Sequence, residues 1–111
     1  MTLDDLIAHC LAKPGAEETY PWGDAELVCK VAGKAFAFIG LDAGTIGLKC
    51  PNDAEELRDR YPDDVKASAY IGRYGWNSVR ANGGVPVDEL RELVDRSYEA
   101  VVSKLPKAKR P

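Results

Sequence analysis

The sequence predicts an α+β two-layer sandwich, in which an antiparallel sheet carries an N-terminal and a C-terminal helix on one face. The first observation is a pair of amphipathic helical patterns near the two ends of the 111-residue chain. The second is a series of short alternating segments between them, joined by turns too short for the crossover helix of a parallel sheet. Two such helices can cover only one sheet face, so we expect the other face to be partly open.

The helical segments are indicated by the spacing of apolar residues and by capping residues. Residues 3–13 are expected to form the first helix, with Thr2 and Asp5 as its capping box. A short helix is expected at about 53–60. The long helix at 87–103 has the strongest pattern, because an apolar stripe runs along its whole length.

The strands are indicated by alternation between turn signals. Residues 17–22 are expected to form an edge strand or a loop, because Pro21 cannot donate to a sheet ladder. Ala32 and Gly33 indicate a tight hairpin turn. The other expected strands are 27–31, 34–41, 45–50, 66–72 and 75–81.

Length and composition predict one domain over residues 1–111, with a basic and flexible tail at 104–111. The three cysteines are widely spaced, so we expect buried free thiols rather than disulfides or a zinc site. No apolar run is long enough to span a bilayer, and the N-terminus is acidic. We therefore expect a cytoplasmic protein with no membrane partner.

The sequence contains no motif typical of catalysis. It has no phosphate-cradling glycine loop and no nucleophile elbow, and the single histidine, His9, has no second histidine at metal-binding spacing. His9 is expected at the surface or at an interface. Paired acidic residues such as Asp4 and Asp5 are interpreted as solvated charges in the first turn of a helix. We therefore expect a non-enzymatic protein without a cofactor or a metal.

Charge is distributed unevenly along the chain. The formal net charge is −3, made up of −7 over residues 1–64 and +4 over residues 65–111. An acidic protein is a poor general binder of nucleic acid, but a basic C-terminal half permits a local surface for anions.

Alternation predicts which side chains lie on the open sheet face. It places Val79 inward with Ala67, Ala69 and Ile71, and leaves the phase of 34–41 ambiguous, so that Phe36 and Phe38 fit either face. The side chains expected on the open face are Lys30, Lys49, Tyr70, Trp76 and Arg80. Interleaved cations and aromatic rings are groups that bind phosphates and stack on bases. The alternative is that Trp76 packs at a sheet edge and the lysines only improve solubility.

A resemblance to a known family is carried by six short stretches spread over nearly the whole chain. They are Glu18-Thr19-Tyr20-Pro21-Trp22-Gly23, Lys30-Val31-Ala32-Gly33-Lys34-Ala35-Phe36, Leu48-Lys49-Cys50-Pro51, Gly75-Trp76-Asn77-Ser78-Val79, Ser97-Tyr98 and Leu105-Pro106-Lys107. Together and in this order they resemble the MmcQ/YjbR family of small bacterial proteins. Trp22 stands where that family more often has Phe.

The resemblance implies a frataxin-type α+β sandwich and DNA binding, with a double-wing mode in which hairpins contact the duplex. It maps this function onto the hairpin at Lys34, the turn at Arg73 and Tyr74, and the basic tail. The tail cations are Lys104, Lys107, Lys109 and Arg110. The resemblance implies no enzyme activity.

The expected function is therefore nucleic-acid binding, with DNA or a single strand as partner and the chain a monomer or weak dimer. The alternative is a protein-interaction module that uses the open sheet face or the edge at residues 17–22. Metal handling by analogy with frataxin-type folds is disfavoured, because the first helix carries only Asp4 and Asp5 as acids.

Overall fold

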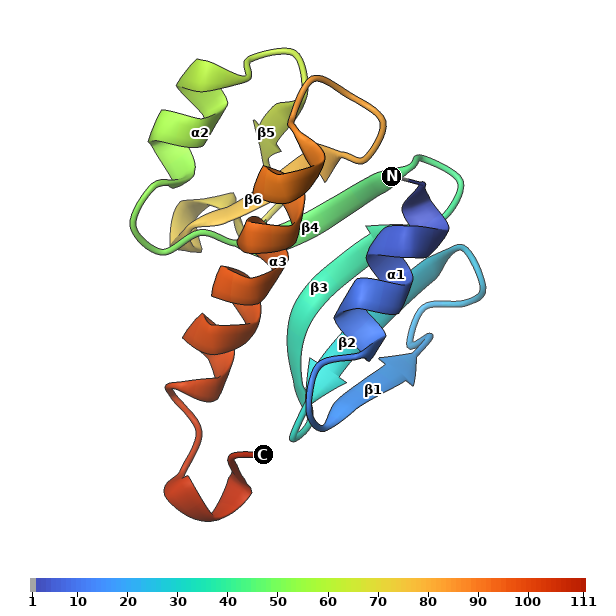
Figure 1. Ribbon diagram of the computed structural model, residues 1–111, viewed down its shortest axis with the longest axis vertical. Coiled ribbons are helices and arrows are strands. Elements are labelled where there is room, and N and C mark those ends of the chain that lie inside the picture. Colours follow the sequence, from blue (N-terminus) through green and yellow to red (C-terminus); the bar gives the residue numbers. More distant parts are fainter. Residues whose placement is uncertain (1) are drawn as a thin grey trace.

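The computed structural model describes residues 2–111, and these residues form three α-helices and one antiparallel sheet of six strands (Figure 1). The helices are α1 (Leu3–Leu11), α2 (Ala54–Arg60) and α3 (Val87–Val102). The strands are β1 (Ala16–Thr19), β2 (Glu26–Val31), β3 (Lys34–Gly40), β4 (Thr45–Lys49), β5 (Val65–Ala67) and β6 (Trp76–Arg80). Their order in the sheet is β1-β2-β3-β4-β6-β5.

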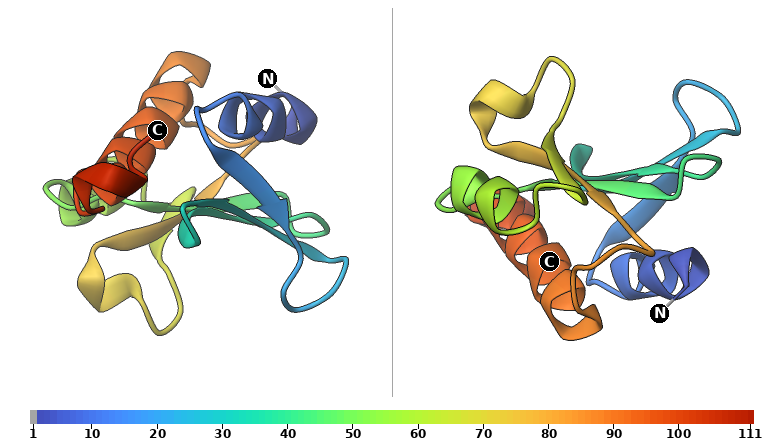
Figure 2. Two further views of the ribbon diagram at one scale, coloured as in Figure 1. Left: turned by 90° about the horizontal axis from the view of Figure 1, so that it is seen from below. Right: turned by 90° about the horizontal axis from the view of Figure 1, so that it is seen from above.

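The helices and the sheet form two layers, which confirms the predicted fold class. Figure 2 shows α1 and α3 together on one face, while the β1–β2 loop and the β5–β6 segment project from the other face. The short α2 packs at the β5 and β6 end of the sheet. No helix among residues 2–111 has the length and apolarity needed to cross a bilayer.

The first helix begins at the predicted capping box. The Thr2 hydroxyl accepts a hydrogen bond from the Asp5 amide at 3.2 Å, and the Asp5 carboxylate accepts one from the Thr2 amide at 2.9 Å. Each bond satisfies an amide that the helix itself leaves unpaired. The helix ends at Leu11, two residues before the end expected from the sequence.

A bulge in β3 resolves the ambiguous phase of that strand. On the neighbouring strand β2, Cys29 pairs with Ala37 and Lys30 pairs with Ala35, so Phe36 of β3 has no partner residue on β2. Phe36 and Ala37 are both fully buried beneath the helices, and the Phe36 ring meets the Tyr98 ring of α3 edge-on at 5.2 Å. Phe38 lies on the other face of the sheet, in contact with Trp76.

Strands β3 and β4 separate beyond the pair Ala37–Leu48, where their register ends. Figure 1 shows the start of β3 turning away from the end of β4. Ser97 of α3 lies in the gap, fully buried. Its hydroxyl donates to the Phe36 carbonyl at 2.6 Å and accepts from the Lys49 amide at 2.9 Å. A helix side chain therefore closes the sheet where the strands do not.

The strand predicted at 66–72 was wrong beyond Ala67. Residues 68–75 form an irregular segment that includes a 3₁₀ turn at 72–74. Tyr70 and Gly75 adopt the left-handed conformation, with φ of 64° and 88°, and neither fits a strand. Ala67 and Ala69, which alternation placed inward, are exposed because the apolar period does not continue into this segment.

The tail at 104–111 folds back on itself. Leu105 is buried and residues 107–109 form a 3₁₀ turn. The Arg110 guanidinium donates to the Leu105 carbonyl at 3.0 Å and to the Ser103 carbonyl at 2.9 Å.

Candidate nucleic-acid interface

Three aromatic side chains form a row across the sheet face that the helices leave uncovered. Trp22 comes from the β1–β2 loop, Phe38 from β3 and Trp76 from β6. The Trp22 and Phe38 ring centroids lie 6.1 Å apart with planes at 22°, and those of Phe38 and Trp76 lie 5.3 Å apart at 70°. Gly47 of β4 lies beside the row, and a Cβ there would lie in ordinary contact with the Phe38 Cβ at 3.4 Å. We call these three side chains the aromatic row.

Two members of the aromatic row, Trp22 and Phe38, line one wall of a groove of about 600 Å³. Trp22 of the β1–β2 loop lines the groove on one side and residues 68–71 line it on the other. Figure 2 shows the two segments projecting from this face of the sheet. Trp22 is 70% exposed and Tyr70 is 95% exposed, although both rings are large and apolar. The groove therefore leaves aromatic surface in water, which is the arrangement that stacking on a base requires.

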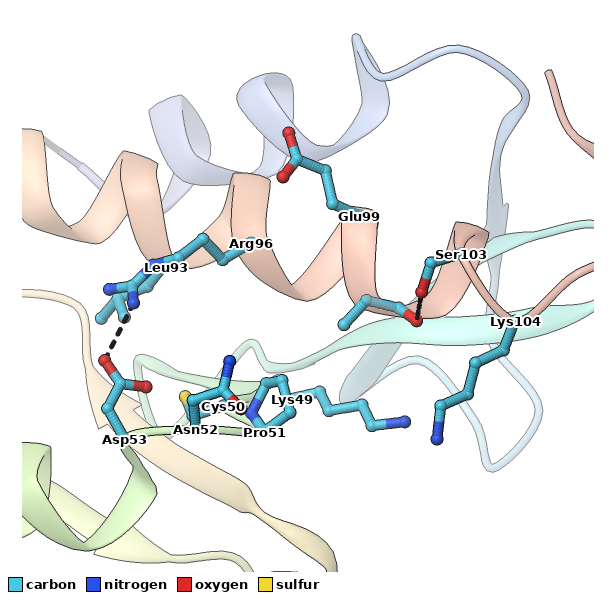
Figure 3. Close-up of a pocket in the computed structure, with 11 residues that line it drawn as sticks. Lys49, Cys50, Pro51, Asn52, Asp53, Leu93, Arg96, Glu99, Ser103 and Lys104 are labelled. Atoms are coloured by element: carbon cyan, nitrogen blue, oxygen red, sulfur yellow. Dashed lines mark hydrogen bonds and ion pairs between the residues drawn. The ribbon is translucent and has the colours of Figure 1, made fainter.

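Three lysines lie at the end of the aromatic row where β3 and β4 separate. Lys34, Lys49 and Lys104 line a hollow of about 270 Å³ together with Trp76. We call it the lysine hollow. Figure 3 shows the Lys49 and Lys104 side chains directed toward each other. Partial burial and the positive charge of Lys104 hold the pKa of Lys49 below its ordinary value.

A second pocket, of about 460 Å³, adjoins the Lys49–Lys104 pair on the side of α3 (Figure 3). Its other charged groups are Arg96, which pairs with Asp53 at 2.9 Å, and Glu99. Glu99 is directed away from the two lysines (Figure 3). The unmatched positive charge thus belongs to the lysine pair.

The predicted cations do not form one continuous patch. Lys49 pairs with Trp76 at one end of the β4–β6 ladder, and Arg80 pairs with Thr45 at the other. Four residues of strand separate the two ends, a distance of about 13 Å. Arg80 also lies 3.9 Å from Asp64. Trp76 and Arg80 do point to the uncovered face as predicted, but only Trp76 adjoins the lysine hollow.

The remaining predicted residues have separate positions. Lys30 lies opposite Ala35 near the hairpin and so at the same end of the sheet as the hollow. Arg73 stacks on the Tyr74 ring at 4.9 Å, over a surface that α2 lines with acids. Lys107 and Lys109 are exposed in the tail turn, and Arg110 is engaged by tail carbonyls.

Two members of the aromatic row were missed or left open by reasoning from the sequence. Trp22 entered only as part of a family-like stretch, and the bulge that sets the direction of Phe38 has no sequence signal that alternation detects. The sequence around Trp22 did, however, indicate an exposed loop. Trp22 follows Pro21 and precedes Gly23, so a large apolar ring was bound to fall in a turn.

Two other groups of reactive residues are structural. His9 Nε2 lies 2.8 Å from an Asp95 carboxylate oxygen that Lys13 also contacts, which joins α1 to α3. The cysteines are free and buried, as predicted; they are Cys10, Cys29 and Cys50. Within residues 2–111, no cluster of three or more His, Cys, Asp or Glu residues is arranged to hold a metal ion.

Comparison with known proteins identifies relatives along nearly the whole chain. The YjbR family model matches residues 11–100. The uncharacterized protein YjbR of Escherichia coli strain K12 is 32% identical over 114 residues, covering 99% of this chain and 95% of the relative, and its counterpart in strain O157:H7 matches equally.

Two solved structures share the fold. The crystal structure of the Deinococcus radiodurans protein DR2400 superposes with a TM-score of 0.89 at 32% identity, covering 98% of this chain and 85% of that one. A crystal structure of a protein from Pseudomonas syringae gives a TM-score of 0.73 at 19% identity, over 90% of this chain and 98% of that one. The second similarity concerns the fold alone.

Proposed function

The chain belongs to the YjbR family, and we propose that it is a non-enzymatic module that binds single-stranded nucleic acid, DNA in the first instance, along its aromatic row. The observation that carries the proposal is the aromatic row on the face that the helices leave uncovered. Trp22 lines the groove at one end of the row, and Trp76 lines the lysine hollow at the other end. Stacked bases would lie on Trp22 and Trp76, and phosphates would approach Lys34 and Lys49.

A single strand suits this surface better than a duplex does. The bases of a duplex are stacked on one another and present only their edges, whereas a single strand can turn a base face toward an aromatic ring. The groove is bounded by two projecting segments and is lined mainly by apolar and small polar side chains. Duplex binding needs a broad basic surface, and Arg80 and Arg73 each lie near acids.

Stacking is expected to supply more of the affinity than charge does. Each stacked base contributes about 1–3 kcal/mol. If the three lysines of the hollow meet phosphates, the logarithm of affinity should fall with the logarithm of salt at a slope of about −2. This slope is modest, as befits a chain whose net charge is −3.

The test is fluorescence anisotropy of a labelled ten-nucleotide oligothymidine and of a matched duplex, at two salt concentrations. We expect the single strand to bind more tightly, and Trp22→Ala to weaken it about 5- to 150-fold. Tyr74→Ala is the matched control, since Tyr74 is 62% exposed but lies outside the groove. Binding that depends on Tyr74 and not on Trp22 would refute the aromatic row and favour the double-wing placement. No binding at low salt would refute the proposal itself.

The alternative function, protein binding by strand addition at β1, has weaker support. β1 is an edge strand of four residues, and its exposed side chains include Glu17 and Glu18. Short, charged edge strands are disfavoured as templates for another strand. A pull-down that recovers one stoichiometric protein and no nucleic acid would reverse this ranking.

A further inference from the structure

The lysine hollow combines features that point to a particular anion. We propose that it binds a phosphate monoester at the end of a nucleic-acid strand, with the terminal base stacked on Trp76. This proposal rests on the function proposed above and names the part of the ligand that this site would recognise.

The convergence of the lysines follows from the local backbone. Because β3 and β4 separate beyond Ala37–Leu48, Lys34 and Lys49 lie on the two sides of the gap. The end of α3 crosses the gap and places Lys104 beside them. Ser97 holds the Lys49 amide at 2.9 Å, so the position of this lysine in the gap is anchored.

The three charges are not balanced by the protein. Among residues 2–111, no carboxylate forms an ion pair with Lys34, Lys49 or Lys104, whereas Lys13 and Arg96 each have an acidic partner. Partial burial and, after it, the nearby charge of Lys104 disfavour the charged form of Lys49 and lower its pKa. An anion bound between them would relieve this repulsion.

A helix dipole explains only part of the cluster. A cation just after the last turn of α3 is favoured there by the partial negative charge of the helix end, which accounts for Lys104. Lys34 and Lys49 lie on strands, but they line the same hollow as Lys104 at the end of α3. The helix end supplies a charge equivalent to only about −0.5, which does not balance three lysines.

Charge and size favour a monoester over an internal phosphodiester. A phosphate monoester carries about −1.5 to −2 at pH 7, because its second pKa is near 6, whereas an internal phosphate carries a single charge. Three lysines match the larger charge. The hollow, at about 270 Å³, is smaller than the usual range for drug-sized ligands. Its apolar walls, Ala35, Val101 and Leu105, suit a small group held against Trp76.

The first experiment compares oligothymidines that carry a 5′-phosphate, a 3′-phosphate or only hydroxyl ends, each labelled at the opposite end or internally. We expect one terminal phosphate to tighten binding about tenfold or more. Lys49→Met and, separately, Lys104→Met should remove this gain. Lys66→Met is the matched control, because Lys66 lies on β5 outside the hollow and its loss changes net charge equally. Circular dichroism confirms that each variant is folded.

The second experiment uses thymidine monophosphate and thymidine alone, followed by amide chemical shifts in ¹⁵N-labelled protein. The monophosphate should shift the amides of Lys49 and Lys104 at lower concentration than the nucleoside does. If phosphorylated and hydroxyl-ended strands bind with equal affinity, the proposed phosphate site in the lysine hollow is refuted, while the proposed binding along the aromatic row is unaffected. Shifts from the monophosphate without binding of any strand would support the hollow and overturn the proposed function.

Discussion

Ser97 is the residue on which the closure of the sheet depends. Its hydroxyl connects two backbone groups in the gap between β3 and β4, the Phe36 carbonyl and the Lys49 amide. Phe36 is the extra residue of a bulge, and the register of β3 with β4 stops before Lys49. The Cys50 amide points the other way, to Gly75 of the β6 side, so the Lys49 amide faces the gap.

Replacing Ser97 by Ala should therefore leave two polar groups, the Phe36 carbonyl and the Lys49 amide, without a hydrogen-bond partner. The site is fully buried, and each unsatisfied backbone group costs about 1–3 kcal/mol. We expect the free energy of unfolding to fall by about 2–6 kcal/mol, a large part of the 5–15 kcal/mol typical of a native protein. A missing hydroxyl leaves little cavity, so the loss reports hydrogen bonding rather than packing.

Urea unfolding followed by tryptophan fluorescence measures the effect, with an expected fall in midpoint of about 1–3 M for an m-value of about 2 kcal/mol/M. Ser103→Ala is the control, because the exposed Ser103 hydroxyl bonds only to the Ala100 carbonyl in its own helix end. The control should change stability by less than about 0.5 kcal/mol. If Ser97→Ala is as mild as the control, the Phe36 carbonyl and the Lys49 amide have other partners and the reasoning about the gap is wrong.

Three further changes test other parts of the fold. The fully buried Asn77 side chain accepts a hydrogen bond from Arg58 at 2.8 Å and donates one to the first carbonyl of α2. Asn77→Ala should therefore lower the free energy of unfolding, measured in urea, by about 2–4 kcal/mol. A loss under about 0.5 kcal/mol would contradict the role of Asn77 in holding α2. Burial raises the pKa of Asp95, but hydrogen bonds from Lys13 and the nearby histidine outweigh burial and hold this pKa below 3.8. The ionised Asp95 therefore stabilises the fold above pH 3.8, and this contribution is lost as the pH falls through the lowered pKa. Asp95→Asn should then cost up to about 1 kcal/mol at pH 6, and this cost should shrink as the pH falls below 3.8; a pH-independent cost would exclude an ionic contribution. Ala32 has φ of 50° in the β2–β3 turn, so Ala32→Asn should raise the unfolding free energy by about 0.5–1 kcal/mol, and a loss would show that the left-handed conformation is not what limits this turn.

The elements that local chemistry determines were predictable from the sequence. The capping box at Thr2, the apolar stripe of α3 and the Ala32–Gly33 turn each act within a few residues. The outward direction of Trp76 and Arg80 followed from simple alternation, because β6 is regular. These features placed the fold class and one end of the candidate site.

The remaining features depend on contacts between distant segments. No residue pattern at 66–72 indicates that Tyr70 takes a left-handed conformation. In the folded segment Gly72 packs so closely against Ala67 that a Cβ on Gly72 would lie 2.9 Å from the Ala67 Cβ. In the tail, the Arg110 guanidinium contacts carbonyls five and seven residues away. Neither contact leaves a period in the sequence, so alternation assigned a strand to 66–72 and composition gave no sign of the 3₁₀ turn in the tail.

The bulge in β3 links the core to the candidate site. In a regular strand, Phe36 and Phe38 would point to the same face, because side chains two residues apart do. If both rings pointed inward, the aromatic row would lose Phe38, its middle member. If both pointed outward, the fully buried Phe36 ring would leave the core beneath α3, at a cost of about 3 kcal/mol or more. One extra residue lets the strand fill the core with Phe36 and present Phe38 between Trp22 and Trp76. The same extra residue ends the β3–β4 ladder early and so opens the gap in which the lysines meet, which makes the row and the hollow consequences of a single irregularity.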